Sequence, residues 1–364
     1  EEVGAGDEAW NAAELAGENY PEAATRYAAA ETAYTAALAA SPERKKTVGV
    51  TVALTPDADY QSINAAIQAV SPDTRIVIKP GLYEEAIVID KKVELAGEGP
   101  RETIRIEPDD DWCVTMKTDE AVVRGLKLYC RVTGDNKKGG IYVEKGKLIV
   151  DDCDIHSDSL SCVEASGAES RVEITQSRLH DSKEGRGAYF HDGATGKLDN
   201  CQVQANAYPG VDVIGGAVVE LVNCRMSDGL AHGVFVSKDG KCTLDTCEMA
   251  ANTSAGIAVV EGGHADVRNC KIHDGKQSGL FANSKGTCLM DTCEIYTNER
   301  AGIEIREQGN PTVRNTIVTR NVYRGVIAHP GALGLIENCD LRGNPRGAYE
   351  IKQGSQLRVN NNQE

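Results

Sequence analysis

The segment Val219-Glu220-Leu221-Val222-Asn223-Cys224-Arg225-Met226 decides the fold, because its apolar and polar residues alternate at nearly every second position. An alternation of period two predicts a β-strand, since successive side chains of a strand point to opposite faces. The same order of apolar alternation, Asn-Cys-x-Ile, an Asn or Gly, and Gly-Val-x-Val recurs along the chain. The segment is therefore one unit of a repeat.

The repeat recurs at a constant interval along the sequence. This interval, the step of the repeat, is the number of residues from Gly187 to Gly210 and from Gly210 to Gly233. Three columns of like residues share this step and stay in phase. The glycine column is Gly187, Gly210, Gly233, Gly256, Gly279, Gly302 and Gly325. The cysteine column is Cys201, Cys224, Cys247, Cys270 and Cys293, followed by Thr316 and Cys339. The third column is Asn206, Gly229, Asn252, Gly275, Asn298, Asn321 and Asn344. Such columns indicate a solenoid of stacked turns.

The kind of solenoid follows from the length and the period of the repeat. Helical repeats need roughly 33 residues or more and a period near 3.6, and the asparagine and leucine spacing of leucine-rich repeats is absent. Short strands joined by tight turns instead predict an all-β protein, a right-handed single-stranded parallel β-helix (pectin-lyase-like solenoid) with about 23 residues per turn. Its turns would stack about 4.8 Å apart, the normal strand separation.

Each column has an expected physical role. We expect the Asn/Gly column, Asn298 included, to hold a left-handed turn residue, because Asn and Gly tolerate positive φ best. We expect the cysteines to point inward as small apolar residues with free thiols, because parallel Cβ vectors suit a disulfide poorly. No tight CxxC pair is present, so we expect no zinc site, and the sequence predicts neither a metal nor a cofactor.

The composition limits which partners the protein is expected to bind and which cellular compartment it is expected to occupy. The chain has 364 residues, of which 39 are basic and 55 acidic, which gives a net charge of −16. This acidity argues against nucleic-acid binding, which needs clustered Lys and Arg. The sequence contains no long apolar run, so we expect no membrane-spanning segment. The free thiols favour a reducing compartment, so we expect a cytoplasmic protein. The start Glu1-Glu2-Val3, without Met, suggests a processed or excised fragment.

Two regions are predicted. Residues 1–45 are Ala-rich and favour a helical hairpin with a linker, and the Gly17-x-x-Tyr20 pattern is similar to a tetratricopeptide hairpin. The alternative is a plain hairpin that attaches the solenoid, at its N-terminus, to another domain of a larger polypeptide. Residues 46–364 are expected to form the β-helix. A short amphipathic helix near residues 60–70 is expected to cap its open apolar end.

A family resemblance is carried by the start of the solenoid. The segment Pro80-Gly81-Leu82-Tyr83-Glu84-Glu85, a Pro-Gly-x-Tyr-x-Glu pattern after a cap helix and a strand, and the later Gly97-Glu98-Gly99 resemble the start of pectin methylesterases. They are also similar to the β-helix region of F-box-type proteins, a group known as the carbohydrate-binding and sugar-hydrolase (CASH) class. The resemblance covers about residues 50–360. It implies the β-helix fold and a role in glycan or protein binding, or in carbohydrate chemistry.

A candidate binding face follows from the strand after each column glycine. Its second residue points outward, and in polysaccharide-acting β-helices the outer face of one sheet carries the site. This outward column is expected to run through Glu164, Tyr189, Asp212, Phe235, Ala258, Phe281, Glu304, Ile327 and Tyr349. Aromatic rings can stack on sugar rings, and acids can accept hydrogen bonds from hydroxyls. The predicted binding residues are Glu164, Tyr189, Phe235, Phe281, Glu304 and Arg306.

A candidate catalytic site lies on the same face. The resemblance to pectin methylesterases, which use two aspartates on neighbouring turns, implies such roles for Asp192 and Asp212, with His191 beside them. The phenylalanines, the upstream glutamines and the arginine segment of that family are missing, so the nucleophile would lack its positioning group. The sequence therefore favours a non-catalytic module that recognises a protein or a glycan, with a carbohydrate esterase, hydrolase or lyase as the alternative.

Overall fold

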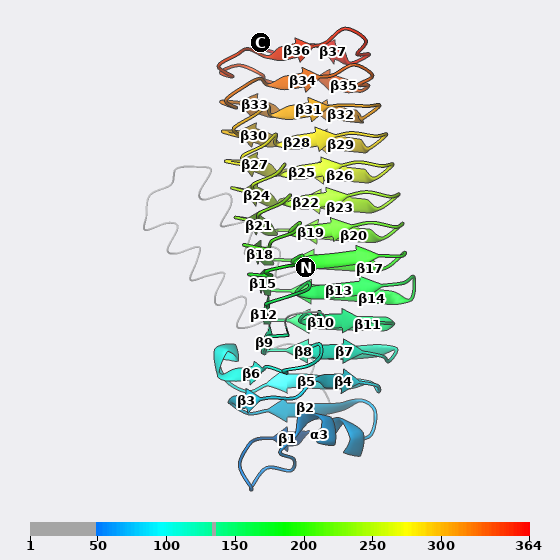
Figure 1. Cartoon of the computed structure of the whole chain (residues 1–364), viewed down its shortest axis with the longest axis vertical. Coiled ribbons are helices and arrows are strands. Elements are labelled where there is room, and N and C mark those ends of the chain that lie inside the picture. The colour runs from blue at the N-terminus through cyan, green and yellow to red at the C-terminus, as the bar shows by residue number, and fades with distance from the viewer. Residues whose placement is uncertain (1–48, 133–135) are drawn as a thin grey trace, which may run out of the picture. The chain divides into compact units, whose positions relative to one another are not determined.

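The computed structural model describes residues 49–132 and 136–364, and residues 49–364 form one compact unit. The helical hairpin predicted for residues 1–45 lies outside the described residues. Successive turns stack from the blue N-terminal end of this unit to its red C-terminal end (Figure 1). The predicted parallel β-helix is confirmed, because every strand pair is parallel and each strand pairs with its counterparts in the preceding and following turns.

Three parallel sheets form the walls of the solenoid. Sheet A, with 14 strands, consists of β1 (Val50–Val52), β2 (Thr74–Ile78), β5 (Val93–Gly97), β8 (Glu120–Arg124), β11 (Gly146–Asp151), β14 (Ser170–Thr175), β17 (Thr195–Asp199), β20 (Val218–Val222), β23 (Lys241–Asp245), β26 (His264–Arg268), β29 (Thr287–Asp291), β32 (Asn310–Arg314), β35 (Leu335–Glu337) and β37 (Arg358–Asn360). Sheet B, with 11 strands, consists of β3 (Gly81–Tyr83), β6 (Ile104–Ile106), β9 (Lys127–Cys130), β12 (Asp154–Ser157), β15 (Arg178–His180), β18 (Gln202–Gln204), β21 (Arg225–Ser227), β24 (Glu248–Ala250), β27 (Lys271–His273), β30 (Glu294–Tyr296) and β33 (Ile317–Thr319). Sheet C, with 12 strands, consists of β4 (Ile87–Ile89), β7 (Val114–Met116), β10 (Ile141–Val143), β13 (Val163–Ser166), β16 (Ala188–His191), β19 (Val211–Val213), β22 (Val234–Val236), β25 (Ile257–Val259), β28 (Leu280–Ala282), β31 (Ile303–Ile305), β34 (Val326–Ala328) and β36 (Tyr349–Ile351).

The turn that begins at β20 shows how the sequence makes these walls. Asn223, with φ 51°, ends the sheet A strand, and Asp228, with φ 58°, ends the sheet B strand. Lys238 and Asp239, with φ 49° and 61°, connect sheet C to the next sheet A strand. Left-handed residues bend the chain sharply between strands, so each short strand can turn into the next wall. The inward side chains of all three walls form one continuous apolar core.

The Asn/Gly column does not occupy the left-handed positions, so that prediction was wrong. Positive φ falls instead on the residue before it, as at Ala251 (54°) and Thr297 (53°). Asn298 is buried, with 1% of its surface exposed, and works through its side chain. Its Oδ1 accepts from the Gly275 N–H at 3.1 Å, and its Nδ2 donates to Asn321 Oδ1 at 2.9 Å. The column therefore links successive turns by amide hydrogen bonds.

The cysteines of the repeat column are buried. All twelve cysteines of the chain lie in the described part and are free thiols. The Cys247 N–H lies 3.4 Å from the Cys270 Sγ of the next turn. Burial raises the pKa of Cys153 to about 12, so this thiol stays protonated at neutral pH.

The motif that carried the family resemblance anchors the only helix longer than one turn among residues 49–132 and 136–364. This helix, α3 (Ile63–Ala69), buries Ile63, Ala66 and Ile67 at the first turns of the solenoid. Ser62 caps it by accepting from the Ala65 N–H. The Glu85 carboxylate accepts from the Ile63 N–H at 2.6 Å and the Asn64 N–H at 3.1 Å. A carboxylate at a helix N-terminus satisfies free N–H groups and the helix dipole. A 3-10 turn, η1 (Arg101–Thr103), precedes β6. Across the described ranges, no helix has the length and apolar character needed to cross a membrane.

Candidate functional site

The outer face of sheet C carries the predicted outward column. Direct strand pairing aligns Tyr142, Glu164, Tyr189, Asp212, Phe235, Ala258, Phe281, Glu304 and Ile327. The column then continues to Glu350, because Ile327 pairs with Glu350 and not with the predicted Tyr349. The constant step of the repeat is kept here, and Ala348 takes the place of the column glycine, since its carbonyl accepts from the Val326 N–H.

His191 lies between two carboxylates on this face. Its Nε2 lies 3.3 Å from Glu164 Oε1, and its Nδ1 lies 2.6 Å from Asp192 Oδ2. The hydrogen bond with Glu164, together with the bond to Asp192, raises the pKa of His191 although partial burial opposes the shift. The Tyr189 ring stacks on the imidazole with a centroid distance of 4.4 Å. The cluster thus holds a histidine whose protonated form is stabilised by two neighbouring carboxylates.

Asp212 is sequestered in a buried ion pair. Only 3% of its surface is exposed, and its Oδ2 accepts from Arg186 Nε at 2.8 Å. Burial raises the pKa of Asp212, although Arg186 opposes the shift. The Arg186 guanidinium also lies over the Tyr189 ring, 4.2 Å from its centroid, and 5.2 Å from that of Tyr208. The Asp212 carboxylate is therefore paired with the Arg186 guanidinium.

The predicted catalytic residues are not all brought to one point. Asp192 sits in the turn after β16 with φ 56°, and its side chain is 70% exposed. It bonds to His191, whereas Asp212, on the strand of the next turn, bonds to Arg186. Ser166 Oγ lies 3.5 Å from both His191 Nδ1 and Asp192 Oδ2. Catalysis by Asp192, Asp212 and His191 stays a prediction.

A cleft of about 200 Å³ opens on the same face around Phe281. Its lining residues are His232, Ser254, Ala255, Gln277, Ser278, Phe281, Arg300, Glu304 and Arg306. It therefore brings together three of the predicted binding residues, Phe281, Glu304 and Arg306. The Phe281 ring is half-buried, and the Arg306 guanidinium lies 5.9 Å from its centroid.

Glu304 is fixed at the wall of this cleft. It is 2% exposed and accepts from Ser278 Oγ at 2.8 Å and from Arg306 Nη2 at 2.6 Å. His329 Nε2 lies 3.1 Å from the same carboxylate. Burial alone would raise the pKa of Glu304, but Ser278 and Arg306 outweigh it and lower the pKa. Glu304 is thus a charged acceptor held in one position.

The charges of the cleft do not cancel. Arg300 and Arg306 are two cations, and Glu304 is the single carboxylate in the lining. Burial lowers the pKa of His232 to about 4, so that ring is neutral and stacks on Phe235 with centroids 5.3 Å apart. The Arg300 side chain is 45% exposed and lies 3.7 Å from Glu304. The cleft therefore combines an apolar ring with one net positive charge.

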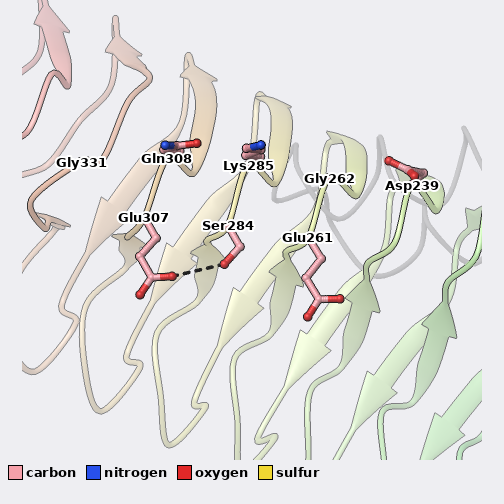
Figure 2. A pocket seen from close by; sticks show the side chains of 8 residues that line it. All are labelled: Asp239, Glu261, Gly262, Ser284, Lys285, Glu307, Gln308 and Gly331. Carbon is pink, nitrogen blue, oxygen red and sulfur yellow. Dashed lines mark hydrogen bonds between the residues drawn. The ribbon is translucent and has the colours of Figure 1, made fainter.

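A larger groove, of about 690 Å³, lies over the turns between sheets C and A. Its lining is Asp239, Glu261, Gly262, Ser284, Lys285, Glu307, Gln308 and Gly331, with Ser284 Oγ 3.4 Å from Glu307 Oε2. Figure 2 shows these side chains in two rows, with Glu261, Ser284 and Glu307 in one row and Asp239, Lys285 and Gln308 in the other. The lining holds no aromatic ring and none of the predicted site residues. Across the described ranges, no group of three or more His, Cys, Asp and Glu could hold a metal ion.

Sequence reasoning missed the residues that hold the acids of sheet C. Arg186, Ser278 and Arg324 each precede a column glycine, and each contacts the acid of the following turn. The contacts join Arg186 to Asp212, Ser278 to Glu304, and Arg324 to Glu350. The position before the glycine thus supplies three polar side chains that contact these acids. These side chains could have been found by adding the short offset along the strand to the constant step of the repeat.

The parallel sheets, the constant step and the exposed outer face define a β-helix protein. The chain belongs to the family described as "Right handed beta helix region", whose model matches residues 128–264 and 209–363. No curated protein sequence matches the chain significantly.

Two solved structures illustrate the shared fold. The A-module of the mannuronan C-5 epimerase AlgE6 from Azotobacter vinelandii is 15% identical, with a TM-score of 0.65, over 83% of this chain and 94% of that one. A variant of the periplasmic alginate epimerase AlgG is 12% identical, with a TM-score of 0.63, over 86% of this chain and 83% of that one. At these identities the similarity establishes the right-handed β-helix fold alone.

Proposed function

We propose that this protein is a non-catalytic recognition module that binds a glycan on the outer face of sheet C. The observation that carries the proposal is the Phe281 cleft, in which an accessible aromatic ring lies beside the fixed carboxylate of Glu304 and the guanidiniums of Arg300 and Arg306. A ring of this kind can stack on a pyranose, and fixed polar groups can orient its hydroxyls. The two structurally similar proteins are a mannuronan C-5 epimerase and an alginate epimerase, and a carbohydrate ligand is consistent with this similarity.

The pairing of the acids supports recognition over catalysis. Glu304 is held by Ser278 and Arg306, and Asp212 is held by Arg186. A nucleophile or a general acid must reach the substrate, and both carboxylates are almost completely buried beneath their partners. Their geometry suits carboxylates that hold Arg186, Ser278 and Arg306 in fixed positions beside a ligand.

The net positive charge of the cleft makes the proposal testable. We expect mannuronan oligosaccharides, which carry a carboxylate on each sugar, to bind more tightly than neutral β-1,4-mannan oligosaccharides in titration calorimetry. Arg300→Gln should lower the affinity for the mannuronan probe by about 3- to 5-fold, the usual range for an exposed ion pair, and leave the mannan probe unchanged. Arg268→Gln, on an exposed position of sheet A, is the matched control. Absence of binding by every glycan, with specific capture of a protein instead, would replace glycan recognition by protein recognition.

A second candidate, acid–base chemistry on a carbohydrate, is favoured by one observation. His191 lies beside Tyr189 and between Glu164 and Asp192, and its pKa is raised. Such a histidine can exchange a proton with a bound sugar. Turnover would be followed by ¹H NMR of mannuronan in D₂O and by ultraviolet absorbance of unsaturated uronates. Turnover that His191→Gln abolishes would establish the enzyme, and a wild-type protein without turnover would remove this candidate.

The cellular setting is proposed from the thiols. Twelve buried free cysteines are compatible with a reducing compartment, so we propose a cytoplasmic protein. Attachment of the solenoid to another domain at its N-terminus is a separate proposal, which the thiols do not address. Cell fractionation of the full-length parent polypeptide tests the compartment. Recovery outside the cytoplasm would contradict it.

A further inference from the structure

Between β10 and β28, aromatic rings occupy every second turn of the sheet C face. In the paired column the rings are Tyr142, Tyr189, Phe235 and Phe281, and the residues between them are Glu164, Asp212 and Ala258. Neighbouring turns are one strand separation apart, so consecutive rings lie about 9.6 Å apart, or twice about 4.8 Å. The four rings therefore form a line with a period of two turns.

Each ring of this line is braced by a planar side chain and stays half-buried. Tyr142 stacks on Trp112 at 5.3 Å, Tyr189 on His191 at 4.4 Å, and Phe235 on His232 at 5.3 Å. Phe281 has the Arg306 guanidinium at 5.9 Å. Bracing fixes the orientation of the rings, so little conformational entropy is lost when a ligand stacks on them.

The residues between the last three rings are recessed. Asp212 is 3% exposed and Ala258 is 0% exposed, whereas Phe235 and Phe281 are partly accessible. Glu164 lies between the first two rings, and its carboxylate is paired with His191. From Tyr189 to Phe281 the face therefore alternates between a partly accessible ring and a recessed position. A continuous apolar patch for a partner protein would have no need of this alternation.

The period identifies a class of glycan. In an extended chain of pyranoses with diequatorial 1,4 linkages, each sugar is flipped relative to the last, so every second sugar shows the same face. Such a chain advances, per sugar, by nearly one strand separation. We propose that the sheet C face takes a diequatorially 1,4-linked glycan running along the solenoid, with every second sugar stacked on Tyr142, Phe235 or Phe281. At Tyr189 the Arg186 guanidinium lies over the ring and would contact the sugar in its place. This inference rests on the proposed glycan recognition and specifies its ligand.

Oligosaccharides that differ in linkage and in length test whether the sugars match the spacing of the rings. The full chain is titrated calorimetrically with β-1,4-mannan oligosaccharides from disaccharide to octasaccharide, and with α-1,4-glucan oligosaccharides of the same lengths. Affinity for the mannan series should rise mainly when an added pair of sugars reaches another ring. The α-1,4-glucan series coils away from a straight line of rings and should gain little with length.

Ring removal provides the second arm. Phe235→Leu and Phe281→Leu keep the apolar bulk but remove the flat ring, and each should weaken octasaccharide binding by about 5- to 10-fold at an unchanged melting temperature. Leu289→Ala, on the exposed face of sheet A, removes apolar surface away from the line and should have no effect.

The outcomes separate this inference from the proposed function. Equal binding of the two oligosaccharide series, or full binding by both leucine variants, would overturn the register and leave glycan recognition standing. Absence of binding by any glycan of either linkage would overturn both.

Discussion

At the scale of single residues, Asn298 shows that a column can have a role different from the most obvious one. Asn favours positive φ, and a repeated Asn/Gly column therefore suggested a left-handed turn. The structure places positive φ on Thr297 and uses the Asn298 amide as a cross-link between turns. A buried amide that satisfies backbone groups explains the preference for Asn as well as a turn does.

The cross-link predicts the effect of substituting Asn298. Asn298→Gly should destabilise by about 1–3 kcal/mol, because the Gly275 N–H and the Ile272 carbonyl lose their partner in a buried site. Ala251→Gly, at a left-handed position one residue before the column, should be neutral or slightly stabilising. Denaturant unfolding of both variants measures the difference. A neutral Asn298→Gly would contradict the role of the amide as a cross-link between turns.

His191 predicts a pH dependence of stability. Because Glu164 and Asp192 raise its pKa in the folded state, protonated His191 stabilises the fold fully below about pH 6.5, the unfolded value. This contribution is lost as the pH rises through the raised pKa. The melting temperature of His191→Gln should therefore fall furthest below wild type near pH 5.5, and the gap should narrow near pH 8.5. A gap that widens with pH would contradict the assigned partners.

At the scale of strands, one irregular pair interrupts the regular core. Gly196 of β17 pairs with Val172 and Val219 on neighbouring strands, so it occupies an inward position. The buried Phe190 ring fills the space, since a Cβ on Gly196 would lie 2.3 Å from Phe190 Cε1. The missing side chain in one wall is thus compensated by a large one in another.

This compensation predicts that substitutions of Gly196 and Phe190 are strongly coupled in their effects on the free energy of unfolding. Gly196→Val should destabilise by about 1–3 kcal/mol through a steric clash, and Phe190→Val by about 2–4 kcal/mol through a cavity. The double variant should be more stable than the sum of the two losses predicts, because the valine side chain enters the space left by the ring. A double-mutant cycle by chemical denaturation checks this result. Additive losses would show that the two positions do not share one space.

At the scale of the whole molecule, the sequence predicted the architecture and part of the face. The constant step of the repeat identified the turns and aligned Glu164, Tyr189, Phe235, Phe281 and Glu304 on one surface. It misplaced the last position because Tyr349 is the second residue after Gly347, whereas Ala348 holds the place of the column glycine. The partners Arg186 and Ser278 were missed because they contact acids of the following turn. Periodicity reports which residues share a column, but not which columns touch.

The thiols give a prediction for the molecule as a whole. All twelve cysteines are buried and free, so a thiol reagent should label few of them in the native protein and about twelve after denaturation without a reductant. Mass spectrometry of the labelled protein gives both counts. Low labelling of the denatured protein would show disulfides and contradict the free-thiol assignment.

The parallel pairing of all three sheets has a mechanical consequence. Backbone hydrogen bonds between turns run along the solenoid axis, so a tensile force applied along that axis would load one turn at a time. The solenoid should peel from an end in steps, each releasing about 80 Å of extended chain as one turn comes away. A force across the axis would meet the bonds of many turns together. The molecule would therefore be compliant in one direction and resistant in the other.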